Sequence, residues 1–182
     1  MTLRIVDFRT LTSAQQAGAA RILREALAHM PSAYNGEGEA EAEVRTFLED
    51  PERAALAALE GKAVRGWIGV IESYSHAWEL HPLVVDPAHQ RRGLGRALTA
   101  ALEAQVKARG VLTLYLGTDD DYGGTNLFGR ELFPDVAAKI GTLRAGERHA
   151  SGFYRRIGYE VVGLIPDANG PGRPDIMMAK QL

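Results

Sequence analysis

The segment spanning residues 78–110 constrains the fold of this chain more than any other. Residues 78–85 form an apolar run that predicts a strand, and residues 93–109 place apolar side chains at helical spacing and stop at Gly110. Residues 111–116 form another apolar run directly afterwards. A strand, an amphipathic helix and a second strand in this order predict a right-handed β-α-β crossover at the centre of a mixed α/β sheet.

The flanking segments predict the rest of the sheet and its helices. A helix is expected from Ser13, as its N-cap, to Met30, and a second, acidic helix leads from Glu37 to about Asp50. Gly61 and the lysine after it join two apolar runs as a hairpin. The remaining expected elements are strands at 3–9, 53–60, 63–71, 159–165 and 175–180, a short helix around 132–140 and a helix at 149–157.

Composition limits the classes of function. The 182 residues contain no repeat, so a single domain over residues 1–182 is expected. A net charge of -2 gives no general attraction to nucleic acid or to an anionic membrane, and neither is expected as a partner. The absence of cysteine excludes disulfides, thiolate metal sites and a cysteine nucleophile. No segment approaches the roughly 18 apolar residues of a membrane span, and a cytoplasmic location is expected.

The turn between the strand and the helix of residues 78–110 has the features of a phosphate site. It reads Gln90-x-x-Gly93-x-Gly95, and the two glycines allow a ligand to approach the backbone at the helix start. A helix N-terminus holds phosphate because its first N–H groups lack partners and its dipole is positive there. Three arginines stand beside the glycines: Arg91, Arg92 and Arg96. The pattern alone is weak, but its strand and helix flanks favour a pyrophosphate site.

Pro82 lies inside the strand predicted at residues 78–85. Proline has no N–H to donate, so it is expected at an edge, at a bulge or where pairing is interrupted. The strand is therefore expected to splay from a neighbour. Leu83 and Val85 could then pair through their backbone groups with an extended ligand that contains amides.

Several segments resemble the GNAT acetyltransferase superfamily, and within it the aminoglycoside 6'-N-acetyltransferases most closely. The glycine-bearing run at 78–95 resembles the acyl-CoA-binding motif of the superfamily. The 6'-N-acetyltransferase resemblance rests on residues 78–85, 114–120, 153–154 and 166–176, and more loosely on Tyr34, the acidic helix and residues 51–53. The resemblance implies an α/β fold with a mostly antiparallel central sheet, a splayed strand pair and flanking helices. It also implies acetyl-CoA as cofactor and, by analogy with related enzymes, a homodimer.

The resemblance implies direct transfer of an acetyl group from acetyl-CoA to a primary amine. Glu79 matches the general base that removes a proton from the amine, and His81 points the same way along the strand. The backbone N–H of Leu83 matches the donor to the developing oxyanion, and Tyr154 matches the proton donor to the leaving thiolate. Each has a structural alternative: an ion pair for Glu79, and core packing for His81 and Tyr154.

The remaining expected ligand contacts fall into two sets. The cofactor set is Leu83, Val84, Val85, Gln90, Arg91, Arg92, Gly93, Leu94, Gly95, Arg96, Thr118 and Tyr154. The acceptor set is Tyr34, Glu79, His81, Asp119, Asp120 and Asp121.

The acidic run at residues 119–121 begins like a calcium loop but does not continue as one. Its fifth position is Gly123 and its twelfth is Arg130, where a calcium loop needs an oxygen ligand and a bidentate glutamate, so no metal is expected. The run is either a solvated loop or a rim that attracts a polycation such as an aminoglycoside. For the acidic helix after Glu37, a solvated face is the favoured interpretation.

The expected activity is transfer of an acetyl group to the 6'-amine of an aminoglycoside. One alternative is acetylation of another amine, such as a polyamine, a protein lysine or an N-terminus, on the same scaffold. The other is a module that binds acyl-CoA without catalysis, although retention of both Glu79 and Tyr154 argues against it.

Overall fold

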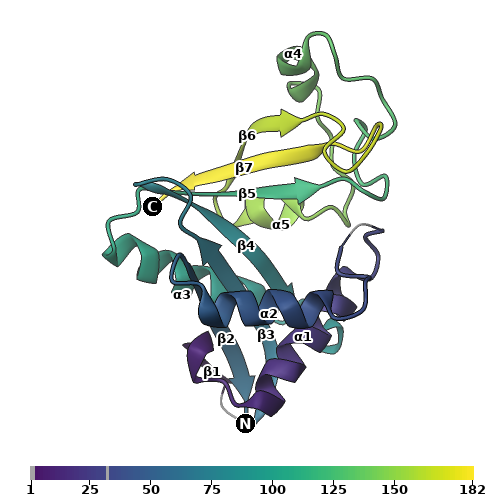
Figure 1. Ribbon diagram of the computed structural model, residues 1–182. Coiled ribbons are helices and arrows are strands. Elements are labelled where there is room, and N and C mark those ends of the chain that lie inside the picture. Colours follow the sequence, from purple (N-terminus) through teal and green to yellow (C-terminus); the bar gives the residue numbers. More distant parts are fainter. Residues whose placement is uncertain (1–2, 32) are drawn as a thin grey trace. The chain divides into compact units, whose positions relative to one another are not determined.

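The computed structural model describes residues 3–31 and 33–182, which divide into two compact units. The first unit holds residues 3–29, 33–114 and 182, and the second holds residues 30–31 and 115–181. Figure 1 identifies the elements of each unit.

The first unit contains a four-stranded sheet in the order β1-β2-β3-β4, with each neighbouring pair antiparallel. Its strands are β1 (Leu3–Asp7), β2 (Arg53–Glu60), β3 (Ala63–Ile71) and β4 (Ala77–Val85). Its helices are η1 (Phe8–Thr10), α1 (Ser13–Leu27), α2 (Glu39–Glu49), η2 (Pro87–His89) and α3 (Leu94–Ala108). The predicted hairpin is therefore confirmed, whereas the first strand is shorter than expected because η1 follows it.

Helices cover both faces of this sheet (Figure 1). On one face Trp67 of β3 donates a hydrogen bond to the Ala19 carbonyl of α1 at 3.1 Å. Its ring packs against Phe8 of η1 and against Phe47 of α2. On the other face a Cβ added at Gly66 would lie 3.3 Å from Leu98 of α3. From Gly66 to Ile71, residues of β3 with odd numbers thus face α1 and α2, and those with even numbers face α3.

The N-cap of α1 differs from the prediction. Thr12, not Ser13, precedes the helix, and its side chain accepts a hydrogen bond from the backbone N–H of Gln15. The Gln15 side chain accepts one from the Thr12 N–H in return, which completes a capping box. Thr12 is the N-cap because Gln15, three positions later, can form the second hydrogen bond of the capping box. Ser13 already lies inside the helix.

The second unit combines three strands with two short helices. Its strands are β5 (Thr113–Asp119), which starts at the boundary, β6 (Glu160–Ile165) and β7 (Asp175–Gln181), in the order β5-β7-β6. Its helices are α4 (Val136–Ile140) and α5 (Ser151–Arg156). β6 and β7 are antiparallel. The expected elements of this region are present, with α4 and α5 shorter than the predicted ranges.

No helix among residues 3–31 and 33–182 combines the length and apolarity that crossing a membrane requires.

Candidate active site

β4 carries a bulge at the proline that the sequence singles out. Ile68 of β3 opposes Leu83, and Val70 opposes Leu80, so His81 and Pro82 together oppose the single residue Gly69. The peptide bond between His81 and Pro82 is cis. A side chain at residue 69 would collide with the His81 carbonyl oxygen and the Phe47 ring, so glycine is required there. The predicted interruption of pairing at Pro82 is therefore present.

The bulge also decides which way the candidate residues face. Glu79 opposes Ile71, an odd-numbered residue, and so lies on the face covered by α1 and α2. Leu83 opposes Ile68, an even-numbered residue, and lies on the α3 face. A regular strand would put both on the same face, because they are four residues apart. One extra residue in β4 reverses the alternation.

The register of β4 also leaves its candidate backbone donors directed away from β3. Asp86 donates its N–H to the Arg65 carbonyl at 2.9 Å, which makes this pair a hydrogen-bonded one. Bonded and non-bonded pairs alternate along antiparallel strands, so Val84 is bonded to β3. The N–H groups of Leu83 and Val85 therefore point to the other edge of β4, as a ligand with amides would need. Val84 directs its backbone groups to β3 and buries its side chain, so its contact with the cofactor stays a prediction.

The loop after β4 presents an open helix start. Gly93 is the N-cap of α3, with φ of 86°, and no side chain caps the helix there. An added Cβ at Gly93 would meet no atom within 4 Å, which leaves space over the first turn at Leu94 and Gly95. Arg91 also has a positive φ, of 60°, and Arg91, Arg92 and Arg96 are exposed. Exposed N–H groups and arginines at one helix start fit a pyrophosphate.

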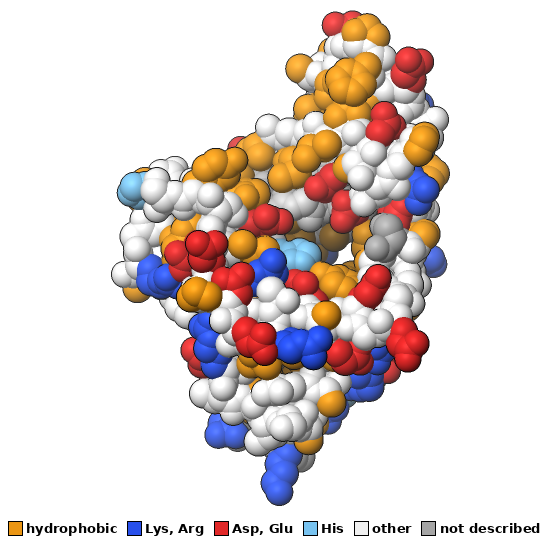
Figure 2. All heavy atoms as spheres, in the orientation of Figure 1, with side chains coloured by type: hydrophobic (Ala, Val, Ile, Leu, Met, Phe, Trp, Pro, Cys, Tyr) orange, Lys and Arg blue, Asp and Glu red, His pale blue; other side chains and the backbone are white. Residues whose placement is uncertain are grey.

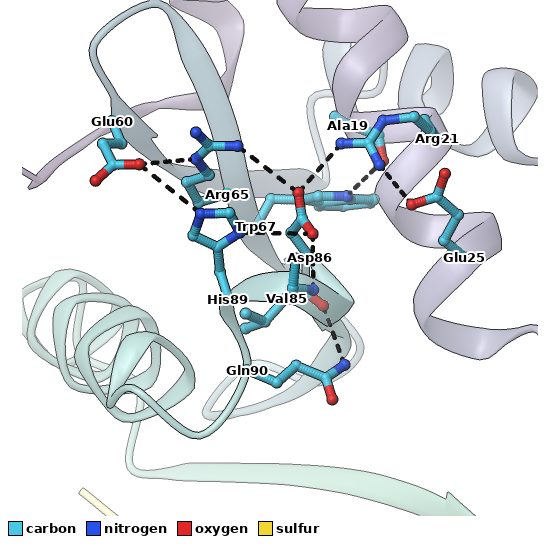
Figure 3. Close-up of polar contacts among 11 residues, drawn as sticks. Ala19, Arg21, Glu25, Glu60, Arg65, Trp67, Val85, Asp86, His89 and Gln90 are labelled. Carbon is cyan, nitrogen blue, oxygen red and sulfur yellow. Dashed lines mark hydrogen bonds and ion pairs between the residues drawn. The ribbon is translucent and has the colours of Figure 1, made fainter.

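A buried carboxylate, Asp86, lies beside the start of this loop (Figure 3). Asp86 is 6% exposed and accepts a hydrogen bond from the Ala88 N–H at 3.0 Å and from Arg21 at 3.2 Å. Its oxygens also lie 3.6 Å from His89 and 3.9 Å from Arg65. Burial alone would raise the pKa of Asp86, but the hydrogen bonds from Ala88 and Arg21 lower it below its usual value. Asp86 therefore remains a carboxylate that holds the end of β4 to η2.

Gln90, the first residue of the glycine pattern, is tied to the same strand. Its side-chain amide donates to the Val85 carbonyl at 3.1 Å. The Gln90 side chain thus fixes the start of the loop. If Gln90 contacts the cofactor, the contact is therefore expected from its backbone.

His81 makes polar contacts with two side chains from elsewhere in the first unit. Its Nε2 lies 2.9 Å from the Tyr34 hydroxyl oxygen and 3.5 Å from a carboxylate oxygen of Glu43 on α2. Glu43 also accepts a hydrogen bond from Arg53 at 3.1 Å. Hydrogen bonding with His81 is the main cause that lowers the pKa of Glu43. Burial and the nearby Glu43 charge raise the pKa of the Tyr34 phenol, so it keeps its proton at neutral pH.

Glu43 corrects the interpretation of α2 as a wholly solvated acidic face. Glu37, Glu39, Glu41 and Glu49 are exposed, but the Glu43 side chain is 18% exposed. The signal is present in the sequence: position 43 follows the buried Ala40 by three and precedes the buried Phe47 by four, which places it on the apolar stripe. Acidic and basic side chains alternate over the face that carries α2 (Figure 2).

The acidic run at the end of β5 is held by hydrogen bonds within the second unit, from its own loop and from the loop between β6 and β7. Asp120 is completely buried and accepts hydrogen bonds from the backbone of Gly124 and from both N–H and hydroxyl of Thr125. Asp121, also buried, pairs with Arg173 at 2.8 Å. Asp119 accepts a hydrogen bond from the Asn169 amide at 2.6 Å. The prediction of a solvated rim is wrong for Asp120 and Asp121, because both carboxylates are buried and accept hydrogen bonds from other groups of the second unit.

Two other predicted residues of the second unit are also buried. The Thr118 hydroxyl donates to the Ile176 carbonyl of β7 at 3.0 Å, so any cofactor contact would involve its backbone. Tyr154 on α5 packs edge-on against Phe153 and Tyr159 and is 7% exposed. Burial raises the pKa of the Tyr154 phenol, which keeps it protonated, as a proton donor must be.

No three His, Asp or Glu side chains come together as a metal site within residues 3–31 and 33–182.

The bulged strand, the glycine-bearing loop and the open helix start fit an acyltransferase of the GNAT class. The model of the acetyltransferase (GNAT) family matches residues 19–130, and the chain belongs to that family. GNAT acetyltransferases use acetyl-CoA, and the N–H groups of β4 that point away from β3, together with the open start of α3, fit this cofactor.

Solved structures extend the similarity over nearly the whole chain. An aminoglycoside 6'-N-acetyltransferase complexed with coenzyme A is 35% identical, with a TM-score of 0.88 over 98% of this chain and 96% of that chain. The aminoglycoside 6'-N-acetyltransferase from Enterococcus faecium is 34% identical, with a TM-score of 0.85 and the same coverage. An aminoglycoside 6'-acetyltransferase of type Ii is 32% identical, with a TM-score of 0.73 over 100% of this chain and 97% of that one. No curated protein matches the sequence.

Proposed function

We propose that this acetyltransferase acts on the 6'-amine of an aminoglycoside. The observation that carries the proposal is the 32–35% identity to three structures of that activity, which covers at least 98% of this chain. The similarity therefore extends to residues 131–182, which lie beyond the match to the family model.

Each candidate residue has a chemical role in this proposal. Glu79 removes a proton from the acceptor amine, since only a neutral amine is a nucleophile. The Leu83 N–H, directed away from β3, donates a hydrogen bond to the acetyl carbonyl oxygen. Tyr154, kept protonated by burial, gives its proton to the departing sulfur. When bound, acetyl-CoA supplies the activated acetyl thioester.

The acceptor is tested by incubating the protein with acetyl-CoA and a panel of aminoglycosides. We expect one added acetyl group by mass spectrometry, placed on the 6'-nitrogen by NMR. An aminoglycoside with a hydroxyl at the 6' position serves as the matched control and should stay unmodified. Turnover of a polyamine, or of a peptide amine, without turnover of any aminoglycoside would replace this acceptor by another amine.

Glu79→Gln separates an enzyme from a module that only binds acyl-CoA. Loss of the general base should lower kcat by about 10²-fold or more, while the Kd of coenzyme A stays the same. Glu49→Gln, which removes an exposed carboxylate from α2, is the matched control and should keep full activity. An unchanged rate in Glu79→Gln would remove Glu79 from the proposed mechanism.

A further inference from the structure

The contacts of His81 with Tyr34 and Glu43 bring together groups from three separate segments. His81 is on the bulge of β4, Glu43 is on α2, and Tyr34 lies 47 residues before His81 in the loop that leads to α2. Both contacts are made to the same ring nitrogen, Nε2. When the imidazole is neutral, its single proton can be on Nε2 or on Nδ1.

The charge beside Nε2 decides between the two tautomers. An unprotonated Nε2 would direct its lone pair toward the region of the Glu43 carboxylate, 3.5 Å away, whereas a protonated Nε2 can donate to Glu43 or to the Tyr34 oxygen. Hydrogen bonding with His81 lowers the pKa of Glu43, so the carboxylate is ionised at neutral pH. A fixed negative charge favours the tautomer with its proton on the nearer nitrogen.

The other groups around this cluster act on Glu43 rather than on the ring. Arg53 of β2 donates to Glu43 at 3.1 Å and also pairs with Asp50 at 3.4 Å. Glu39, on the first turn of α2, adds negative charge near Tyr34. Arg53 thus holds the Glu43 carboxylate in place and offsets part of its charge, and Asp50 offsets part of the charge of Arg53.

We propose that Glu43 is a positioning residue that holds His81 as the Nε2–H tautomer, with Tyr34 as a second partner of that nitrogen, and so leaves Nδ1 free to accept a proton. Glu79, as proposed above, takes the first proton and leaves a neutral amine. Once that amine attacks the thioester carbon, a second N–H bond breaks, its electron pair stays on the nitrogen, and this second proton forms a bond to Nδ1. The imidazolium then carries protons on both nitrogens, and the Glu43 carboxylate stabilises its charge. The proton leaves to solvent afterwards, so no further reactant is needed.

The tautomer is measured on the free protein by NMR of ¹⁵N-labelled imidazoles, with His81→Gln to assign the signals. We expect the neutral His81 ring of the wild type to carry its proton on Nε2, with Nδ1 unprotonated. Glu43→Gln removes the charge and should shift His81 toward the Nδ1–H tautomer or a mixture of both. Glu43→Asp keeps a carboxylate and should retain the wild-type pattern. A wild-type His81 protonated on Nδ1, or a pattern that Glu43→Gln leaves unchanged, would overturn the proposal.

The matched control is Glu41→Gln, which removes the same charge from the same helix. Glu41 is exposed and pairs with Arg24 at 3.1 Å, away from His81, so the His81 signals should not move. Thermal unfolding of every variant is recorded alongside. A stability loss in Glu43→Gln without a change of tautomer means that Glu43 only supports the fold, and this also overturns the proposal.

The effect on rate rests on the proposed function, but the tautomer does not. With any amine that the enzyme acetylates, Glu43→Gln should lower kcat by about tenfold or more and leave the KM for acetyl-CoA unchanged. If aminoglycosides are not acetylated, the NMR result still tests the role of Glu43. If the tautomer changes while kcat does not, the proton does not pass through His81.

Discussion

At the scale of single residues, Gly93 and Glu43 are required for different reasons, the first for backbone conformation and the second for charge. Gly93 is needed for its backbone conformation, since its φ of 86° belongs to the left-handed region. Glu43 is needed for its charge, which lies beside His81. The first demand is visible in the sequence as a glycine at a helix start. The second depends on which helix packs over the bulge of β4.

Gly93→Ala should weaken the cofactor site. An alanine finds space at this position, but the left-handed backbone costs about 1–2 kcal/mol for a residue with a Cβ, so the loop shifts. We expect lower stability in urea unfolding and a higher Kd for coenzyme A in calorimetry. Gly152→Ala, in helix α5, is the contrasting substitution: its φ is outside that region and its Cβ meets only an ordinary contact. It should stabilise the protein by up to about 1 kcal/mol. Equal effects of the two substitutions would contradict this explanation.

At the scale of elements, the site depends on how β4, η2 and α3 are joined. Asp86 ties the end of β4 to η2 and to Arg21 of α1, and Gln90 returns to the Val85 carbonyl (Figure 3). These contacts fix the direction from which the chain enters α3. The glycine loop therefore has a rigid support although its arginines are exposed.

Asp86→Asn should loosen this support. The substitution keeps the shape but removes the charge from a buried network, and we expect a loss of about 2 kcal/mol in stability and weaker binding of coenzyme A. Glu60→Gln is the control, because Glu60 pairs with Arg65 at the outer, more exposed side of the same network. Its cost should stay within about 1 kcal/mol. The explanation fails if Glu60→Gln weakens coenzyme A binding as much as Asp86→Asn.

The start of α1 provides a test of the corrected N-cap. Thr12→Ala removes the capping box and should cost about 1 kcal/mol in urea unfolding, without changing the KM for acetyl-CoA. Ser13→Ala, one residue later, should stay within about 0.5 kcal/mol of the wild type. The reverse order of the two costs would restore Ser13 as the cap.

At the scale of the whole molecule, stability in acid depends on buried groups in each unit. His149 of the second unit is 2% exposed, and burial lowers its pKa below the ordinary value. Its Nδ1 lies 2.8 Å from the Ser151 hydroxyl at the start of α5. The folded chain thus holds His149 neutral where the unfolded chain would bind a proton.

Stability should therefore decrease as the pH falls below about 6.5, the ordinary value for histidine. In that range the unfolded chain binds more protons than the folded one, so each pH unit costs up to about 1.4 kcal/mol until the lower folded pKa is passed. Asp86 and Glu43, whose pKa values are also lowered, contribute only below about pH 4. His149→Gln should flatten urea-unfolding stability between pH 7.5 and 5, whereas the exposed His76→Gln should not. A slope that survives in His149→Gln would assign it to another group.

Much of the fold was predictable because its signals are local. The helix over residues 94–108, the hairpin at Gly61 and the glycine helix start follow from spacing and turn residues within a few positions of one another. The candidate site was predictable only where a motif runs along one segment. Asp120 was expected at a solvated rim, but partners that close its loop bury it, and no local pattern indicates that burial.

The sequence by itself determined the strand, turn and helix of residues 78–110 and, with them, the open helix start at Gly93 where we propose that the cofactor binds. Only the tertiary structure decided that His81 and Pro82 both oppose Gly69, which puts Glu79 and Leu83 on opposite faces of β4. It also decided that Glu43 and Tyr34 meet His81. The physical reason is that helical and strand periodicities depend on neighbours along the chain, whereas register and side-chain contacts depend on how distant elements pack together.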